Sequence, residues 1–175
     1  MSQYRCGICG KKHSPLPMDI AQQYPHDYFS IPPQEREQRI QVTSDLCVID
    51  NNRFFIRGYL PIPVFVDKQE FGWGLWVEVE PSSFDQYLEL YNADGAGEAP
   101  FRGRLSAQLK CYEPSVYKLP VNVHLRGVNE RPLLLFSDLV EHPLAKEQRQ
   151  GITIERVHEI LRQSLPSLFE KLDQS

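Results

Sequence analysis

The sequence has 175 residues, of which 41% are hydrophobic and 11% aromatic, a length and composition typical of one globular domain with its own core. Its formal net charge is −4 and its basic residues are scattered among acidic ones, so we expect no nucleic-acid partner, because such binding relies on clustered Lys and Arg. No run of about 18 apolar residues occurs, which predicts the absence of a transmembrane helix and of a membrane partner.

The first 39 residues form a polar segment that is rich in cysteine and proline. Within it, the stretch PPQEREQR at 32–39 predicts a short helix, because proline suits a first helical turn and charged residues suit an exposed one. The segment has too few apolar residues for a core of its own. We therefore expect one domain over 1–175, in which residues 1–39 pack on a core formed by residues 40–175.

Alternation of apolar and polar residues is the main signal after this segment, and it is typical of strands with one buried face. It predicts strands at 40–49, 54–60, 70–80, 103–112 and 117–126. The run PLLLF at 132–136 is apolar on both faces, which suits a central strand.

Two segments show helical spacing of apolar residues instead. The first covers 82–91 behind a serine cap, and the second covers 153–172 behind Thr153, with a break expected after Ser164 because Pro166 follows. Together the elements predict an α+β fold, with a mainly antiparallel sheet of about five or six strands and flanking helices.

The stretch CGICGKKH near the N-terminus is the strongest chemical signal in the chain. Cys6 and Cys9 are spaced so that both thiolates can bind one ion, and Gly7 and Gly10 let backbone N–H groups turn toward the sulfurs. His13, four residues beyond Cys9, is the nearest third ligand. This pattern predicts a segment like a zinc knuckle.

A structural zinc ion takes four protein ligands, so one more must come from elsewhere in the chain. Cys47 is the better candidate because it lies on the less apolar face of its predicted strand, whereas Cys111 shares a face with apolar residues and fits a core position. We therefore predict a structural zinc ion on Cys6, Cys9, His13 and Cys47, which would fasten the N-terminal segment to the sheet.

A redox pair is the main alternative for Cys6 and Cys9. Cys-x-x-Cys oxidoreductases place the pair after a strand and at a helix N-terminus, which lowers one thiol pKa. Here no strand of useful length precedes the pair and GKKHSPLP is a poor helix, so redox chemistry is the weaker interpretation. Two cysteines without a ligand remain a further alternative.

Two other places are candidate interaction surfaces. On one face of the predicted strand 70–80, Gly72 and Gly74 lie beside Trp76 and leave a shallow space that the 82–91 helix or a partner could fill. The polar loop 141–153 holds His142 and is a second candidate, although a plain connection to the last helix is the simpler interpretation.

Five sequence blocks resemble a bacterial domain-of-unknown-function family, number 2199. They are CGICGKKH, SDLCVI, FFIRGYLPIPV, FGWGLWVEV and EHPLAKEQRQGIT, in the family's order and spread over nearly the whole chain. The resemblance implies a small, soluble bacterial protein with a Cys-x-x-Cys start. It implies no activity and no catalytic residue.

The leading functional hypothesis is a cytoplasmic, non-enzymatic module with structural zinc that binds a protein or a small ligand. The cytoplasm follows from four cysteines without a visible secretory signal. One alternative is an enzyme that uses the cysteine pair as a redox centre, or the metal with an open coordination position. Another is an immunity or regulatory partner of a second bacterial protein.

Overall fold

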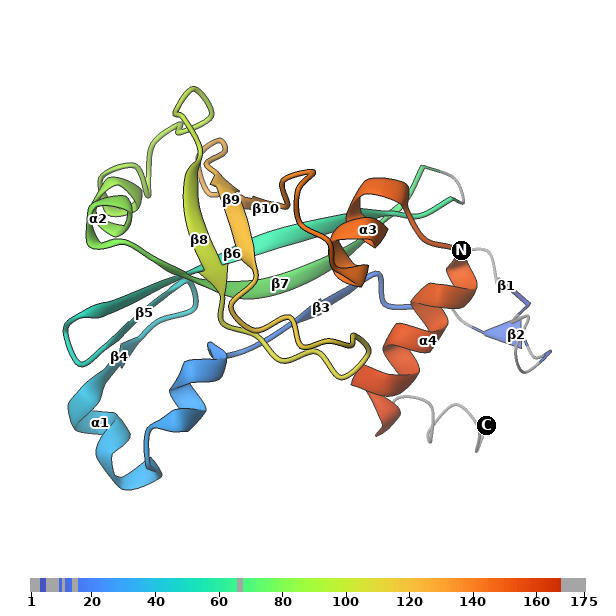
Figure 1. Cartoon of the computed structure of the whole chain (residues 1–175), viewed down its shortest axis with the longest axis horizontal. Helices are drawn as coiled ribbons and strands as arrows, with labels where there is room; N and C mark the ends of the chain where they lie inside the picture. The colour runs from blue at the N-terminus through green and yellow to red at the C-terminus, as the bar shows by residue number, and fades with distance from the viewer. Residues whose placement is uncertain (1–3, 6–9, 11, 14–15, 66–67, 168–175) are drawn as a thin grey trace.

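The computed structural model of the protein describes residues 4–5, 10, 12–13, 16–65 and 68–167 (Figure 1). Its strands are β1 (Tyr4–Arg5), β2 (Lys12–His13), β3 (Asp19–Ala21), β4 (Ile40–Val42), β5 (Leu46–Ile49), β6 (Arg53–Pro63), β7 (Glu70–Val79), β8 (Phe101–Leu105), β9 (Pro120–His124) and β10 (Leu133–Leu135). Its helices are α1 (Arg36–Arg39), α2 (Pro81–Glu89), α3 (Pro143–Gln150), α4 (Ile154–Ser164) and the 3-10 helices η1 (His26–Ser30) and η2 (Pro33–Glu35). The predicted α+β class is confirmed.

The main sheet closes into a five-stranded barrel. Strands β6, β7, β8, β9 and β10 pair in that order, and β10 returns to β6. The hairpin of β6 and β7 is the longest pairing, and it runs from Phe54 opposite Val79 to Pro63 opposite Glu70. Because both strands extend past the barrel, β5 and β4 continue the sheet from β6, and β3 continues it from β7.

The sequence of β6 explains how one strand serves two surfaces. Ile56, Leu60 and Ile62 are fully buried in the main core. They alternate with Arg57 and Tyr59, which are half-buried and lie on the outer face of the barrel. Period-two alternation thus separates a core face from a polar face along the same strand.

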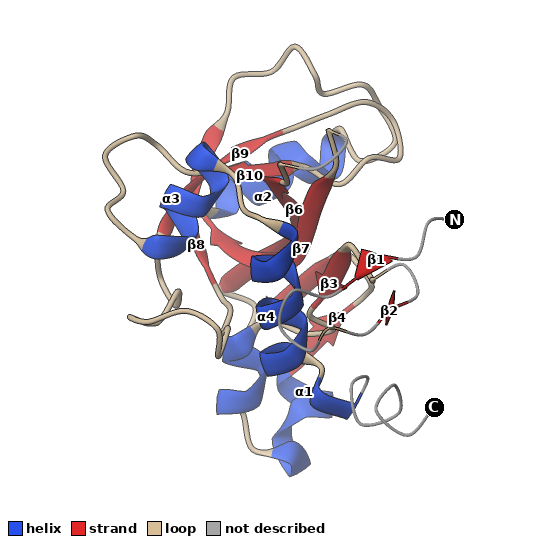
Figure 2. Cartoon of the chain, turned by 90° about the vertical axis from the view of Figure 1, so that its right-hand side faces the viewer, coloured by secondary structure: helices blue, strands red, loops and turns tan. Residues whose placement is uncertain are grey.

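Helices cover the two ends of the barrel. Viewed along the long axis, α3 and α4 lie across the near end and α2 lies at the far end (Figure 2). Their buried apolar side chains join the main core: Phe84 and Tyr87 from α2, Leu144 and Ala145 from α3, and Val157, Ile160 and Leu161 from α4. No described helix is both long and apolar enough to span a membrane.

Residues 16–39 extend the sheet beside β7 and then cover the outer face of β5, β6 and β7. Strand β3 pairs with β7 in parallel, with Ile20 opposite Trp73. Beyond β3, Ile31 packs in a second apolar cluster with Cys47, Phe55 and Trp76, each of which is completely buried. The polar N-terminal segment is therefore ordered by packing its few apolar side chains on the sheet.

The predicted strand 40–49 is wrong in one respect, because the structure divides it into β4 and β5. The Thr43 hydroxyl accepts hydrogen bonds from the N–H groups of Asp45 and Leu46, and this side-chain turn reverses the chain. The reversal also resets the alternation. Cys47 and Ile49 are buried, so the prediction that Cys47 lies on the less apolar face is wrong.

The other predicted elements differ mainly in their ends. Strand β8 ends at Leu105, several residues before the predicted end of its strand, and the predicted loop 141–153 contains the helix α3. The final helix agrees with the sequence: the Thr153 side chain accepts a hydrogen bond from the Arg156 N–H, and α4 ends at Ser164. The predicted remainder up to 172 lies largely outside the described residues.

The barrel interior makes a specific prediction about Gly58. A Cβ at this buried glycine would lie 2.5 Å from a methyl carbon of Leu134, itself fully buried. Gly58→Ala should therefore lower the free energy of unfolding by about 1–3 kcal/mol, because the added methyl overpacks the core. Gly97→Ala is the matched control, since nothing lies within 4 Å of that Cβ.

Urea denaturation of both variants measures this difference. The control should change the free energy of unfolding by less than about 0.5 kcal/mol. Equal stabilities of the two variants would contradict the described contact between β6 and β10.

Candidate ligand-binding pocket

One edge of β6 changes its partner halfway along the strand. Strand β5 is antiparallel to β6 and pairs with its first half, starting from Leu46 opposite Ile56. Strand β10 is parallel to β6 and starts from Leu133 opposite Tyr59. Both strands thus begin near the middle of β6 and run in opposite directions, which leaves a gap at their starts.

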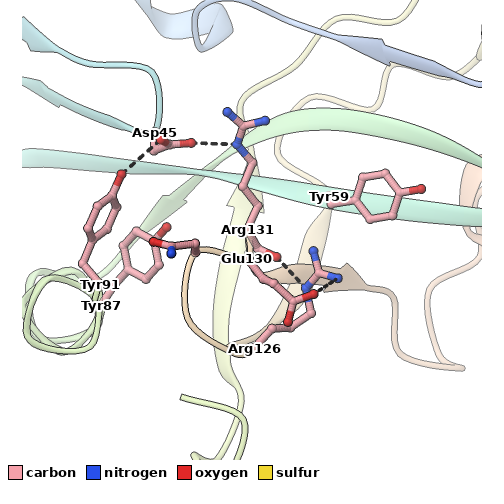
Figure 3. A pocket seen from close by; sticks show the side chains of 8 residues that line it. Asp45, Tyr59, Tyr87, Tyr91, Arg126, Glu130 and Arg131 are labelled. Carbon is pink, nitrogen blue, oxygen red and sulfur yellow. Dashed lines mark hydrogen bonds and ion pairs between the residues drawn. The ribbon is translucent and has the colours of Figure 1, made fainter. Parts of the chain in front are cut away.

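The residues just before β5 and β10 meet at this gap. The Arg57 N–H donates to the Asp45 carbonyl over 2.9 Å, and the Tyr59 N–H donates to the Pro132 carbonyl over 2.8 Å. These two bonds bring the β4–β5 turn and the β9–β10 loop to neighbouring positions on β6. As a consequence Asp45 and Arg131 face each other across the gap (Figure 3).

A pocket of about 620 Å³ lies at the gap, a volume in the range of small-molecule sites. Four segments supply its walls: the β4–β5 turn, β6, the β9–β10 loop, and the C-terminal part of α2 together with Tyr91, two residues beyond the end of that helix. The lining residues are Asp45, Tyr59, Tyr87, Tyr91, Arg126, Asn129, Glu130 and Arg131.

Asp45 is held in its ionised form by three donors. Arg131 Nε lies 2.7 Å from Asp45 Oδ1, and the hydroxyls of Ser44 and Tyr91 donate to Oδ2. Burial alone would raise the pKa of Asp45, but the hydrogen bonds from Arg131 and Ser44 and the positive charge of Arg131 lower it below its usual 3.8.

Positive charge exceeds negative charge at this end of the pocket. Arg131 engages Asp45 through Nε, and no described residue accepts a hydrogen bond from its two terminal nitrogens. The Arg57 side chain reaches the β4–β5 turn, where its Nη1 donates to the Ser44 carbonyl, while its Nε is buried and has no acceptor among the described residues. Burial, and then the nearby charge of Arg131, lower the pKa of Arg57.

The wall next to Asp45 is aromatic. The rings of Tyr87 and Tyr91 meet edge to face with centroids 5.7 Å apart, one turn from each other along the chain. Tyr87 is buried and its hydroxyl makes no hydrogen bond with any described residue. Tyr59 stands on the far side of Arg131 (Figure 3). Its hydroxyl donates to Glu70, and Arg126 lies over its ring.

The loop side of the pocket is organised by Arg126. Its Nε donates to the Arg131 carbonyl over 2.6 Å, and its Nη1 lies 3.4 Å from a Glu130 carboxylate oxygen (Figure 3). The first bond fixes the backbone of Arg131. A binding surface with a cationic end and an aromatic wall therefore forms from residues that no single strand or helix could place together.

The structure describes two of the four predicted zinc ligands, His13 and Cys47, and they lie in different regions. Cys6 and Cys9 lie outside the described residues, and only the backbone of His13 is described, so the zinc site stays a prediction. Strand β2, which ends at His13, lies at the opposite end of the long axis from β5, which carries Cys47 (Figure 1). The structure thus does not bring His13 and Cys47 together.

Cys47 itself is a core residue. It is completely buried with Ile49, Phe55 and Trp76, and burial, with a smaller contribution from the negative charge of Asp27, raises the pKa of its thiol to about 12. A thiol in this environment resists the deprotonation that zinc binding requires. Within the described residues, no group of three or more His, Cys, Asp or Glu side chains is arranged to hold a metal.

The predicted surface of Gly72, Gly74 and Trp76 is closed within the chain. A Cβ on Gly72 would meet the Tyr59 ring, and one on Gly74 would meet Ala21 of β3. Trp76 is completely buried, and its indole N–H donates to the Gln22 carbonyl. The predicted cover was the 82–91 helix, but α2 packs on the main core, and the N-terminal segment and Tyr59 cover this face instead.

His142 is buried and caps α3. Its Nδ1 accepts a hydrogen bond from the Leu144 N–H, and its Nε2 lies 2.8 Å from the Pro114 carbonyl oxygen, so a neutral ring with its proton on Nε2 satisfies both. These contacts join the start of α3 to the loop before β9. His142 and Trp76 therefore have structural roles in the described chain and do not form an exposed surface.

The sequence of the chain matches a family of bacterial proteins. The model of the family described as uncharacterized protein conserved in bacteria (DUF2199) matches residues 5–152. The chain belongs to this family. The match starts next to the Cys-x-x-Cys stretch and includes every pocket residue, so the pocket lies in the family's domain. No curated protein and no solved structure matches the chain.

Asp45 makes a pH-dependent contribution to stability. Its folded pKa is lowered, so its ionised form stabilises the fold above pH 3.8, and this contribution is lost as the pH falls through the folded pKa. At pH 7, Asp45→Asn should lower the free energy of unfolding by about 1–2 kcal/mol, because Arg131 then loses its ion-pair partner and Arg57 loses a nearby negative charge.

Denaturation of wild type and Asp45→Asn between pH 3 and pH 7 measures this effect. The difference in the free energy of unfolding between the two proteins should stay constant above about pH 5 and shrink below about pH 4. Asp85→Asn, on the exposed face of α2, is the control and should change stability little at any pH. A stability difference that does not depend on pH would contradict the ion pair between Asp45 and Arg131.

Proposed function

We propose that the protein is a non-enzymatic binding module whose pocket takes a small ligand with an anionic group attached to a ring. The observation that carries this proposal is the guanidinium of Arg131. Asp45 holds it in place through Nε, and its two terminal nitrogens have no described acceptor. An arginine fixed in this way is prepared for a bidentate contact with a carboxylate or phosphate.

The local charge supports an anionic group. Asp45 pairs with Arg131 and its charge also acts on Arg57, so one negative charge is set against two positive ones. Arg57 is half-buried and its Nε has no acceptor among the described residues, which is costly, so an anionic ligand nearby would reduce that cost. Arg131 is more exposed, and its terminal nitrogens are open to a ligand. The chain as a whole has a net charge of −4, so the positive potential is a local feature and not a general one.

The aromatic wall supports a ring. Tyr87 and Tyr91 present apolar edges and faces next to the cationic end, and the free Tyr87 hydroxyl can donate to or accept from a ring substituent. Convergent polar groups with aromatic walls are the usual composition of small-molecule pockets. Tyrosine also loses little conformational entropy on binding.

Phenyl phosphate and benzoate are suitable probes for this pocket. Both carry a ring and an anionic group, and comparison of the two separates phosphate recognition from carboxylate recognition. In a titration followed by backbone amide chemical shifts, we expect at least one of them to shift the signals of 57–59 and 126–131 more than phenol does. Arg131→Gln should weaken this binding about tenfold or more, since a charge-assisted contact is lost.

Two further variants sharpen the result. Arg131→Lys keeps the charge but loses the planar fork, so it should bind more weakly than wild type and more strongly than Arg131→Gln. Lys110→Gln removes one exposed positive charge outside the pocket and should bind as wild type does. Equal affinities of Lys110→Gln and Arg131→Gln, or shifts confined to other residues, would exclude the pocket as the binding site.

We also propose a structural zinc ion on Cys6, Cys9 and His13. Support comes from the ligand spacing and from the antiparallel pairing of β1 with β2, in which Tyr4 lies opposite His13. Cys47 is the weakest of the predicted ligands because it is completely buried on β5. The fourth ligand therefore stays open in this proposal.

Elemental analysis of protein purified without added metal tests the zinc ion. We expect about one equivalent of zinc, which Cys6→Ser and Cys9→Ser should remove. Cys47→Ala should keep the zinc, and loss of zinc in this variant would restore Cys47 as the fourth ligand. A metal-free wild-type protein would contradict the zinc site altogether and favour the redox or unliganded alternatives.

A further inference from the structure

A second cavity lies on the outer face of the barrel and shares no residue with the first pocket. We call it the basic groove. It has a volume of about 840 Å³, and it is bounded by the turn before β6, the end of β7, strand β8 and the start of β9. Its lining residues are Asn52, Arg53, Glu78, Val79, Glu80, Pro81, Arg102, Gly103, Arg104, Lys118 and Pro120.

The floor of the basic groove is a closed ion network. Glu78 lies between Arg53 at 2.6 Å and Lys118 at 2.6 Å. Arg53 also reaches Asp27, which is buried and accepts further hydrogen bonds from Ser106 and Tyr117. The carboxylates of this network are therefore already occupied by its own cations and hydroxyls.

Arg102 and Arg104 line the groove beside this network. They are two residues apart on β8, so both project from the outer face of the sheet, and both are exposed. Among the described residues, neither side chain forms an ion pair or a hydrogen bond. Gly103 between them faces the barrel interior, where a Cβ would meet Val77. Arg102 and Arg104 are therefore the side chains that this part of β8 presents to the groove.

The charges of the lining residues do not balance. Four are basic, namely Arg53, Arg102, Arg104 and Lys118, and two are acidic, namely Glu78 and Glu80. The basic groove is thus cationic in a protein whose net charge is −4. Asp27 and Glu78 together balance Arg53 and Lys118, so the surplus positive charge lies on Arg102 and Arg104, which only Glu80 offsets among the lining residues.

We infer that the basic groove binds a compact anion with at least two negative charges, carried by phosphate or carboxylate groups. Two arginines on one face of a strand have Cα atoms about 6.6 Å apart, close enough for both forks to contact one diphosphate or tricarboxylate. Lys118 adds a third positive group at the side of the groove. This inference does not depend on the ligand of the first pocket.

Pyrophosphate and citrate test the inference, and they distinguish phosphate from carboxylate recognition. At about 50 mM salt, one of them should bind and shift the backbone amide signals of 101–105 and 118–121. The double variant Arg102→Gln/Arg104→Gln should weaken this binding about tenfold or more. Both side chains are exposed, so the variant should fold, which circular dichroism checks.

The control is Lys68→Gln/Lys110→Gln, which removes the same charge from two exposed positions outside both cavities. It should bind as wild type does. Equal weakening by the two double variants would show that only the overall charge matters and would overturn the site. Tighter binding of a ten-residue glutamate peptide than of either small anion would also overturn it, in favour of an acidic protein partner.

Discussion

Backbone hydrogen bonds between β6 and β7 hold together two strands that are each longer than the barrel they help to form. Every other part of the fold depends on this excess length. The inner residues of both strands, such as Leu60 and Leu75, build the main core, while the free edges accept β5 and β10 on one side and β3 and β8 on the other. The first pocket exists because β5 and β10 begin at the same point of β6 and run apart.

Electrostatics gives the two cavities different characters. In the first pocket, Asp45 neutralises part of the charge of Arg57 and Arg131 and orients the latter. In the basic groove, Glu78 is fully used by Arg53 and Lys118, and the surplus lies on exposed arginines. The first arrangement is preorganised and partly buried, which suits selective binding of a small molecule, whereas the second is open and depends more strongly on salt.

Local patterns in the sequence predicted the fold class, β6, β7 and the start and end of α4, because these elements have clear periodicity and caps. The 40–49 segment shows where periodicity fails: alternation continues through Thr43–Asp45, and only the hydroxyl of Thr43 marks the turn. Cys47 was misplaced for this reason. Nothing in the sequence marked Arg131 or Tyr87 as pocket residues, although Tyr87 belongs to the helical pattern of 82–91, since their meeting depends on sheet pairings between distant segments.

The central claim is that the gap on the edge of β6 is a ligand site built around Arg131. A crystal structure of the protein with 4-bromobenzoate tests it most directly, because the bromine can be located by its anomalous signal. The account predicts the carboxylate on the terminal nitrogens of Arg131 and the bromine beside Tyr87 and Tyr91. Bromine signal elsewhere on the molecule, with the pocket empty, would contradict it.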